Sequence, residues 1–181
     1  MFRFLVGLVM GLILAPLLAI VYLLSGSAPI AVRDHSFPLE SYITGAALER
    51  GVARRAPKGQ PSNFKASDLM AGAETYRRGC GCHGLPGERT PWAGKMFPPP
   101  PQLFTPDGYV TDDPVGVTFW KIKNGIRMTG MPSFSAVLTD DQIWQVAALL
   151  ARADRLPPDV MDALNQPRLS PQPPTVTNGR H

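Results

Sequence analysis

The first residues of the chain constrain it most, because they contain a long apolar run without a charge. Phe4 to Leu24 is uncharged throughout, and Arg3 precedes it. About 20 apolar residues in a helix match the hydrocarbon thickness of a bilayer. Pro16 lies inside the run, but proline is tolerated in membrane helices. We therefore predict that residues 1–27 form a transmembrane anchor. A cleaved signal segment is the alternative, because small residues follow at positions 25–28.

The charge at the start of the chain predicts which side of the membrane the rest of it faces. Arg3 and the free amino terminus favour a cytoplasmic N-terminal end by the positive-inside tendency. The residues after position 28 would then lie on the opposite side, which in a bacterium is the periplasm. We expect a single-pass protein of the bacterial inner membrane.

Proline and glycine divide the remaining chain into segments. The 20 prolines are about twice the usual share of roughly 5 %, which indicates long irregular stretches. We predict that residues 28–66 are a linker with one amphipathic helix, either solvated or lying on lipid headgroups. Residues 67–156 are the expected main domain. Residues 157–181 are expected to be a poorly ordered proline-rich tail with one short helical turn.

Helices are the only regular elements that the main domain is expected to contain. Their starts follow hydroxyl or acidic capping residues, and their ends precede glycine or proline. The expected helices run from Ser67 to Cys80, from Pro114 to Asn124 and from Gln142 to about Arg155. No strand signal of any strength interrupts them, so the predicted fold class is all-α. Gly72 and Tyr76 are expected to cross the last helix at Trp144, Ala147 and Leu150.

The distribution of charge argues against a nucleic-acid partner. The net charge is +4, and its excess lies in residues 1–66. Residues 67–156 carry nine Lys and Arg against nine Asp and Glu. A neutral domain offers no basic surface for a phosphate backbone, so no nucleic acid is expected to bind.

Both cysteines of the chain lie in the run Cys80-Gly81-Cys82-His83. A Cys-x-x-Cys-His run marks covalent haem attachment, and this run is one residue shorter. Cysteines at i and i+2 point about 200° apart on a helix, so two thioethers require a departure from helical geometry. Gly79 and Gly81 permit that departure. We predict Cys80 and Cys82 as attachment residues, with Cys82 the surer one because it adjoins His83.

Three other interpretations of this run remain open. A structural zinc ion needs four ligands, and the only other histidines are His35 and His181. A redox disulfide closed over one residue would be strained. The two cysteines could also be present by chance. We favour haem because further motifs downstream suit it.

An axial methionine is expected on a loop downstream of His83. Electron-transfer cytochromes commonly hold haem iron between a histidine and a methionine. Met131 lies between Gly130 and Pro132, and proline biases the residue before it toward extended geometry. Met96 is a weaker candidate, and Met128 is expected to be a core or lid residue. We predict His83 and Met131 as the metal ligands.

The run Pro98–Pro101 is expected to orient His83. A metal-bound histidine normally donates its other ring N–H to an acceptor such as a carbonyl oxygen. Prolines supply carbonyls without N–H groups of their own. We predict Pro99 or Pro100 as the acceptor, and both as cofactor-binding residues. A stiff wall without this hydrogen bond is the alternative.

Four segments together resemble a class I c-type cytochrome domain. They are AGAETYRRGCGCHGLPG, MFPPPPQL, FWKIKNGIRMTGMPSF and LTDDQIWQVAALL, within about residues 67–156. In more detail the chain is similar to membrane-anchored bacterial monohaem cytochromes, with CxCH in place of CxxCH. The resemblance implies a small helical fold around one haem c with its iron, His83 and Met131 as axial ligands, and electron transfer rather than enzymatic catalysis. Implied partners are redox proteins or a membrane respiratory complex. A haem-binding sensor or a structural subunit is the alternative.

Overall fold

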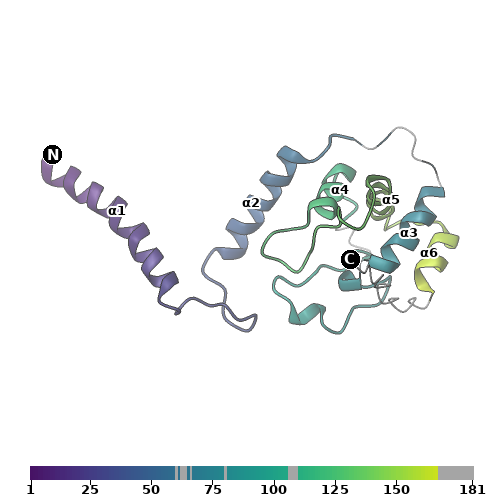
Figure 1. Ribbon diagram of the computed structural model, residues 1–181, viewed down its shortest axis with the longest axis horizontal. Helices are drawn as coiled ribbons and strands as arrows, with labels where there is room; N and C mark the ends of the chain where they lie inside the picture. The colour runs from purple at the N-terminus through teal and green to yellow at the C-terminus, as the bar shows by residue number, and fades with distance from the viewer. Residues whose placement is uncertain (60, 62–64, 66, 80, 106–109, 167–181) are drawn as a thin grey trace, which may run out of the picture. The chain divides into compact units, whose positions relative to one another are not determined.

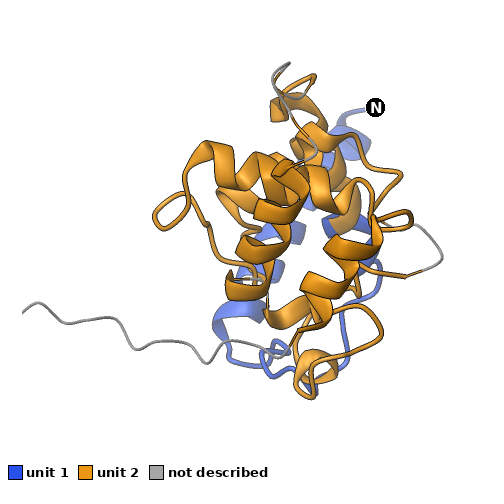
Figure 2. Ribbon diagram, turned by 90° about the vertical axis from the view of Figure 1, so that its right-hand side faces the viewer, with its two compact units in different colours: residues 1–44 blue, residues 45–181 orange. Residues whose placement is uncertain are grey.

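The computed structural model describes residues 1–59, 61, 65, 67–79, 81–105 and 110–166 (Figure 1). They belong to two compact units, residues 1–44 and residues 45–181, which Figure 2 colours separately. The regular elements of these described residues are all helices. One isolated β-bridge joins Leu85 to Glu88. The all-α prediction is therefore confirmed.

The first unit consists mainly of helix α1 (Phe2–Leu24), none of whose residues is buried. By length and composition α1 is able to cross a membrane, although a signal sequence would meet the same criteria. The amide of Ser25 ends the helix by donating to the carbonyls of Val21 and Tyr22. The unit continues into the first turn of helix α2 (Glu40–Arg55).

The C-terminal half of α2 belongs to the second unit and packs into it. Val52 is only 2 % exposed, so the alternative of a fully solvated helix is wrong for this half. The chain after α2 also approaches α4 (Val115–Asn124) closely. A Cβ atom at Gly116 would overlap the carbonyl oxygen of Pro57. The C-terminal half of the predicted linker helix therefore packs as part of the main domain.

The centre of the second unit is the packing of α3 (Ser67–Gly79) against α5 (Asp140–Leu150). The predicted crossing at Gly72 is present. A Cβ atom there would lie 2.8 Å from the carbonyl carbon of Gln145 and 3.3 Å from Leu149 Cβ. The partners at the crossing differ from the prediction, because Trp144 instead stacks on Phe119 of α4 with a centroid separation of 4.0 Å.

Local capping explains where α4 and α5 begin and end. Thr139 and Gln142 form a capping box at the start of α5, which satisfies amides that the helix leaves unpaired. Gly125 ends α4 with a φ of 68°, a conformation that glycine adopts without strain. The prediction for the end of α5 was wrong. The helix ends at Leu150 instead of near Arg155, and turns follow it.

The tail after Pro157 is more structured than the sequence suggested. Helix α6 (Pro158–Asn165) packs against α3 and buries Val160 and Leu164. Leu164 is fully buried. The expectation of a poorly ordered tail is therefore wrong for residues 158–165, because two apolar residues at helical spacing complete the core.

Candidate functional site

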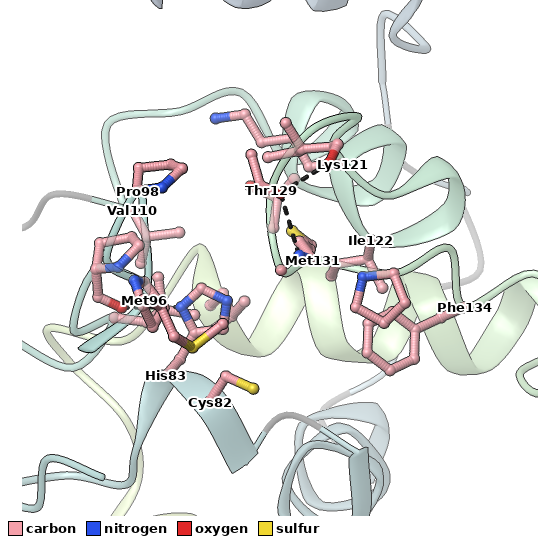
Figure 3. Close-up of a pocket in the computed structure, with 18 of the residues that line it drawn as sticks. Cys82, His83, Met96, Pro98, Val110, Lys121, Ile122, Thr129, Met131 and Phe134 are labelled. Atoms are coloured by element: carbon pink, nitrogen blue, oxygen red, sulfur yellow. Dashed lines mark hydrogen bonds between the residues drawn. The ribbon is translucent and has the colours of Figure 1, made fainter. Parts of the chain in front are cut away.

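A cavity of about 460 Å³ opens inside the second unit (Figure 3). Its walls come from the 3-10 helix η1 (Gly81–His83), the proline-rich loop that follows η2 (Ala93–Lys95), helix α4 and the loop after it. Most of the lining is apolar. The lining residues that bear on its chemistry are Cys82, His83, Met96, Pro98–Pro101 and Met131.

The imidazole of His83 is held by one carbonyl of the proline run. Its Nδ1 atom lies 2.9 Å from the carbonyl oxygen of Pro101. Because a carbonyl only accepts, Nδ1 carries the proton and donates, which leaves the lone pair of Nε2 available in the neutral ring. Burial lowers the pKa of His83, and the hydrogen bond to Pro101 opposes this effect. A neutral imidazole of one tautomer is the form that binds a metal.

The proline run does supply a carbonyl oxygen to His83, as predicted, but the predicted proline was wrong. The acceptor is Pro101 rather than Pro99 or Pro100. Pro99 and Pro100 instead line the cavity together with the other prolines of the run. The run therefore both forms a wall and orients the imidazole, which the sequence had offered as alternatives.

Cys82 lies on the same short helix as His83 and lines the same cavity. Its thiol is free, and its backbone carbonyl accepts a hydrogen bond of 2.9 Å from the Thr90 hydroxyl. Helix α3 ends at Gly79, and η1 begins as a separate 3-10 helix at Gly81. Cys80, the other predicted attachment residue, lies outside the described residues.

Met131 reaches the cavity from the loop that follows α4, so its sulfur and the imidazole of His83 come from separate elements (Figure 3). The amide of Met131 donates to the hydroxyl of Thr129 over 3.1 Å, and its carbonyl accepts from the amide of Ile126 over 3.1 Å. A Cβ atom at Gly125 would lie 2.6 Å from the carbonyl carbon of Pro132, so the loop folds tightly onto the end of α4. The fold thus fixes the backbone that carries Met131.

The two other candidate methionines occupy different surroundings. Met96 lines the cavity, and a Cβ atom at Gly130 would overlap its terminal methyl group. Met128 is 92 % exposed and has a φ of 60°. The interpretation of Met128 as a core residue is therefore wrong, because the tight loop turns its side chain outward.

Two further residues support the site although sequence reasoning missed them. Leu48 of α2 lines the cavity, one helical turn before the buried Val52. The apolar stripe of that helix was the sequence signal for such a residue. The side-chain amide of Gln102 donates to the carbonyls of Leu85 and Glu88 over 3.1 and 2.8 Å. It thereby braces the loop after His83, and no sequence pattern indicated that role.

The donor set of the cavity fits a haem group. A free thiol lies beside an imidazole whose Nε2 is unprotonated, and a thioether sulfur reaches the same space from another element. Thiols attach haem c covalently, and imidazole and thioether are the usual ligands of iron in electron-transfer cytochromes. The apolar lining excludes water from such a group.

Comparison with known proteins supports this assignment. Residues 67–150 match the family described as cytochrome c oxidase, cbb3-type, subunit III. No curated protein and no solved structure matched the chain. The matched residues contain the thiol, the imidazole and the thioether of the cavity. Residues 67–150 are therefore a class I c-type cytochrome domain, which carries covalently bound haem c with its iron and transfers electrons.

Proposed function

We propose that this protein is a membrane-tethered electron carrier in which His83 and Met131 are the axial ligands of one haem c. The observation that carries the proposal is that both side chains line one cavity while a hydrogen bond to Pro101 keeps His83 Nε2 available. Haem supplies the one-electron chemistry when bound, and the chain orients the ligands and excludes water.

The two proposed ligands, His83 and Met131, would affect the haem iron in different ways. The carbonyl of Pro101 increases the basicity of the His83 imidazole and fixes the plane of its ring. A methionine opposite a histidine raises the reduction potential of haem iron. The hydrogen bonds of the Met131 backbone would limit movement of the loop that carries this sulfur. This arrangement suits an electron carrier because little reorganisation is needed.

We propose that Cys82 forms the thioether that anchors the haem. It lines the cavity directly beside His83, and both residues lie on the short 3-10 helix η1. Cys80 would add a second thioether. Mass spectrometry of the proteolytic peptide that contains residues 80–83 distinguishes one bond from two. A peptide of unmodified mass would contradict the attachment altogether.

We further propose that α1 anchors the domain and that the domain faces the periplasm. The length and composition of α1 support a span, and Arg3 supports this orientation. The matched family is described as an oxidase subunit, so a membrane respiratory complex or its redox proteins are the proposed partners.

The purified full-length protein provides the direct test of the proposed ligand pair. Haem should remain with the chain on a denaturing gel, and the reduced protein should show the sharp α-band of a six-coordinate, low-spin haem. A broad, high-spin spectrum would contradict the proposed pair and would favour a five-coordinate haem sensor. A chain without haem would contradict the proposal as a whole.

A further inference from the structure

A group of apolar side chains follows α1 and is not buried by the unit that contains it. Their exposed fractions range from 38 % at Phe37 to 92 % at Ile30. The group consists of Ile30, Val32, Phe37, Leu39, Tyr42 and Ile43. Large exposed apolar side chains gathered in one short segment mark a surface that another phase or molecule covers.

We propose that residues 28–43 lie in the membrane–water interface beside the outer end of α1, and we call this segment the interfacial collar. The proposal rests on the proposed membrane tether. It commits to the lipid interface as the occupant, because the segment follows the span directly and one aromatic contact returns it to the end of the span.

That contact joins Tyr22 to Phe37. The two rings meet edge to face, with centroids 6.0 Å apart and planes at 75°. Tyr22 lies in the last turn of α1, and its hydroxyl donates to the carbonyl of Ser27. This contact therefore keeps Phe37 next to the C-terminal end of α1, although Phe37 follows that end by 13 residues. Aromatic rings with one polar end are enriched at this depth of a bilayer.

The backbone of the collar is suited to an environment that is poor in water. The carboxylate of Asp34 accepts from the amides of Ile30 and Ala31 over 2.9 and 2.8 Å. The carboxylate of Glu40 accepts from the amide of Phe37 over 2.8 Å. These bonds close two turns locally, which reduces the cost of moving their amides out of bulk water. The apolar side chains remain free to enter the acyl boundary.

The charge of the collar predicts how it would bind lipid. Residues 28–43 carry Arg33 as the only Lys or Arg, against Asp34 and Glu40. Attraction of a polybasic segment to anionic headgroups is therefore not available. Binding must come from burial of apolar side chains, so it should depend little on salt or on anionic lipid.

The collar would shorten the tether of the haem domain. Residues held at the interface do not contribute their length to the reach of a linker, which is at most about 3.6 Å per extended residue. The domain would then search for its redox partner close to the membrane surface instead of at the end of a long linker.

Fluorescence quenching in a bilayer tests the collar with the full-length haem protein. The variants are Leu39→Trp in the collar and, as a matched control, Glu49→Trp on the exposed surface of α2 in the second unit. Each is reconstituted into vesicles of zwitterionic lipid, with or without bromine on the upper acyl chain. For each variant, the ratio of the fluorescence intensity with brominated lipid to that without it cancels quenching by haem. The unsubstituted protein gives the fluorescence of the native tryptophans, which is subtracted.

We expect brominated lipid to reduce the Leu39→Trp signal at least twofold more than the Glu49→Trp signal. The difference should persist at high salt. Equal quenching of the two variants would overturn the collar and would mean that a protein partner or water covers the segment. Quenching that disappears at high salt would also overturn it, because that result requires attraction between charges.

The mass of the purified protein separates failure of the collar from failure of the tether. An intact chain recovered only with detergent retains α1, so equal quenching would then count against the collar alone. A shortened chain that is soluble without detergent would show that the first residues are a cleaved signal, and both proposals would fail.

Discussion

The hydroxyl of Tyr76 donates a hydrogen bond of 2.9 Å to the carbonyl oxygen of Gly84. Tyr76 is 1 % exposed, and Gly84 directly follows His83 and has a φ of 81°. The Tyr76 ring also packs edge-on against Phe104, with centroids 5.2 Å apart. A core residue of α3 thus fixes the point at which the chain turns after the imidazole.

Removing this hydroxyl should destabilise the domain while the haem remains attached. We expect Tyr76→Phe to lower the free energy of unfolding by about 1–2 kcal/mol, because the buried carbonyl of Gly84 loses its donor. Guanidinium unfolding of the haem protein measures the change. Tyr42→Phe is the matched control, because Tyr42 is exposed, and it should change stability by less than about 0.5 kcal/mol. Equal effects of the two substitutions would show that the bond to Gly84 contributes nothing.

Replacing the proposed methionine ligand should change the spectrum of the haem. We expect Met131→Ala to convert a six-coordinate, low-spin spectrum into a high-spin spectrum and to let added imidazole bind. Met128→Ala is the matched control, because Met128 lies three residues earlier, is 92 % exposed and does not line the cavity. If Met131→Ala retained a low-spin spectrum, another residue would be the ligand. Met96, which also lines the cavity, would be the first to examine.

Shortening Leu48 should lower the reduction potential. The side chain closes part of the cavity, so Leu48→Ala would admit water, which stabilises the more highly charged ferric haem. We expect a fall of tens of millivolts in a spectroelectrochemical titration. Glu49→Ala on the exposed side of the same helix should leave the potential within error. An unchanged potential in Leu48→Ala would mean that α2 does not shield the haem.

A methyl group at Gly72 should disrupt the crossing of α3 and α5. Its Cβ atom would overlap backbone atoms of Gln145, and these cannot move aside as the end of a flexible side chain could. We expect Gly72→Ala to destabilise the domain by about 1–3 kcal/mol, measured by thermal or guanidinium unfolding. Gly45→Ala meets open space inside α2 and should be neutral or stabilising by up to about 1 kcal/mol. A neutral Gly72→Ala would show that the helices separate without cost.

The proline run and the methionines show which features of the site could be predicted from the sequence. The sequence predicted that the run would supply a carbonyl to His83, because proline leaves its carbonyls without competing N–H groups. It predicted the wrong proline, since four adjacent prolines are chemically alike and only the path of the loop selects Pro101. It assigned Met128 to the core or to a lid. The core alternative is wrong, because Met128 has a positive φ in a tight loop and its side chain is exposed to solvent.

The sequence by itself determined the helical class, most of the helix limits and the segments that carry the proposed haem ligands. It could do so because caps, prolines and hydrophobic periodicity act over a few neighbouring residues. Only the tertiary structure decided that Leu48 lines the cavity, that Gln102 braces its loop and that α6 completes the core. Those outcomes depend on which surfaces meet in space. A local apolar pattern, such as the stripe of α2, indicates that a face is buried but not which distant segment it packs against.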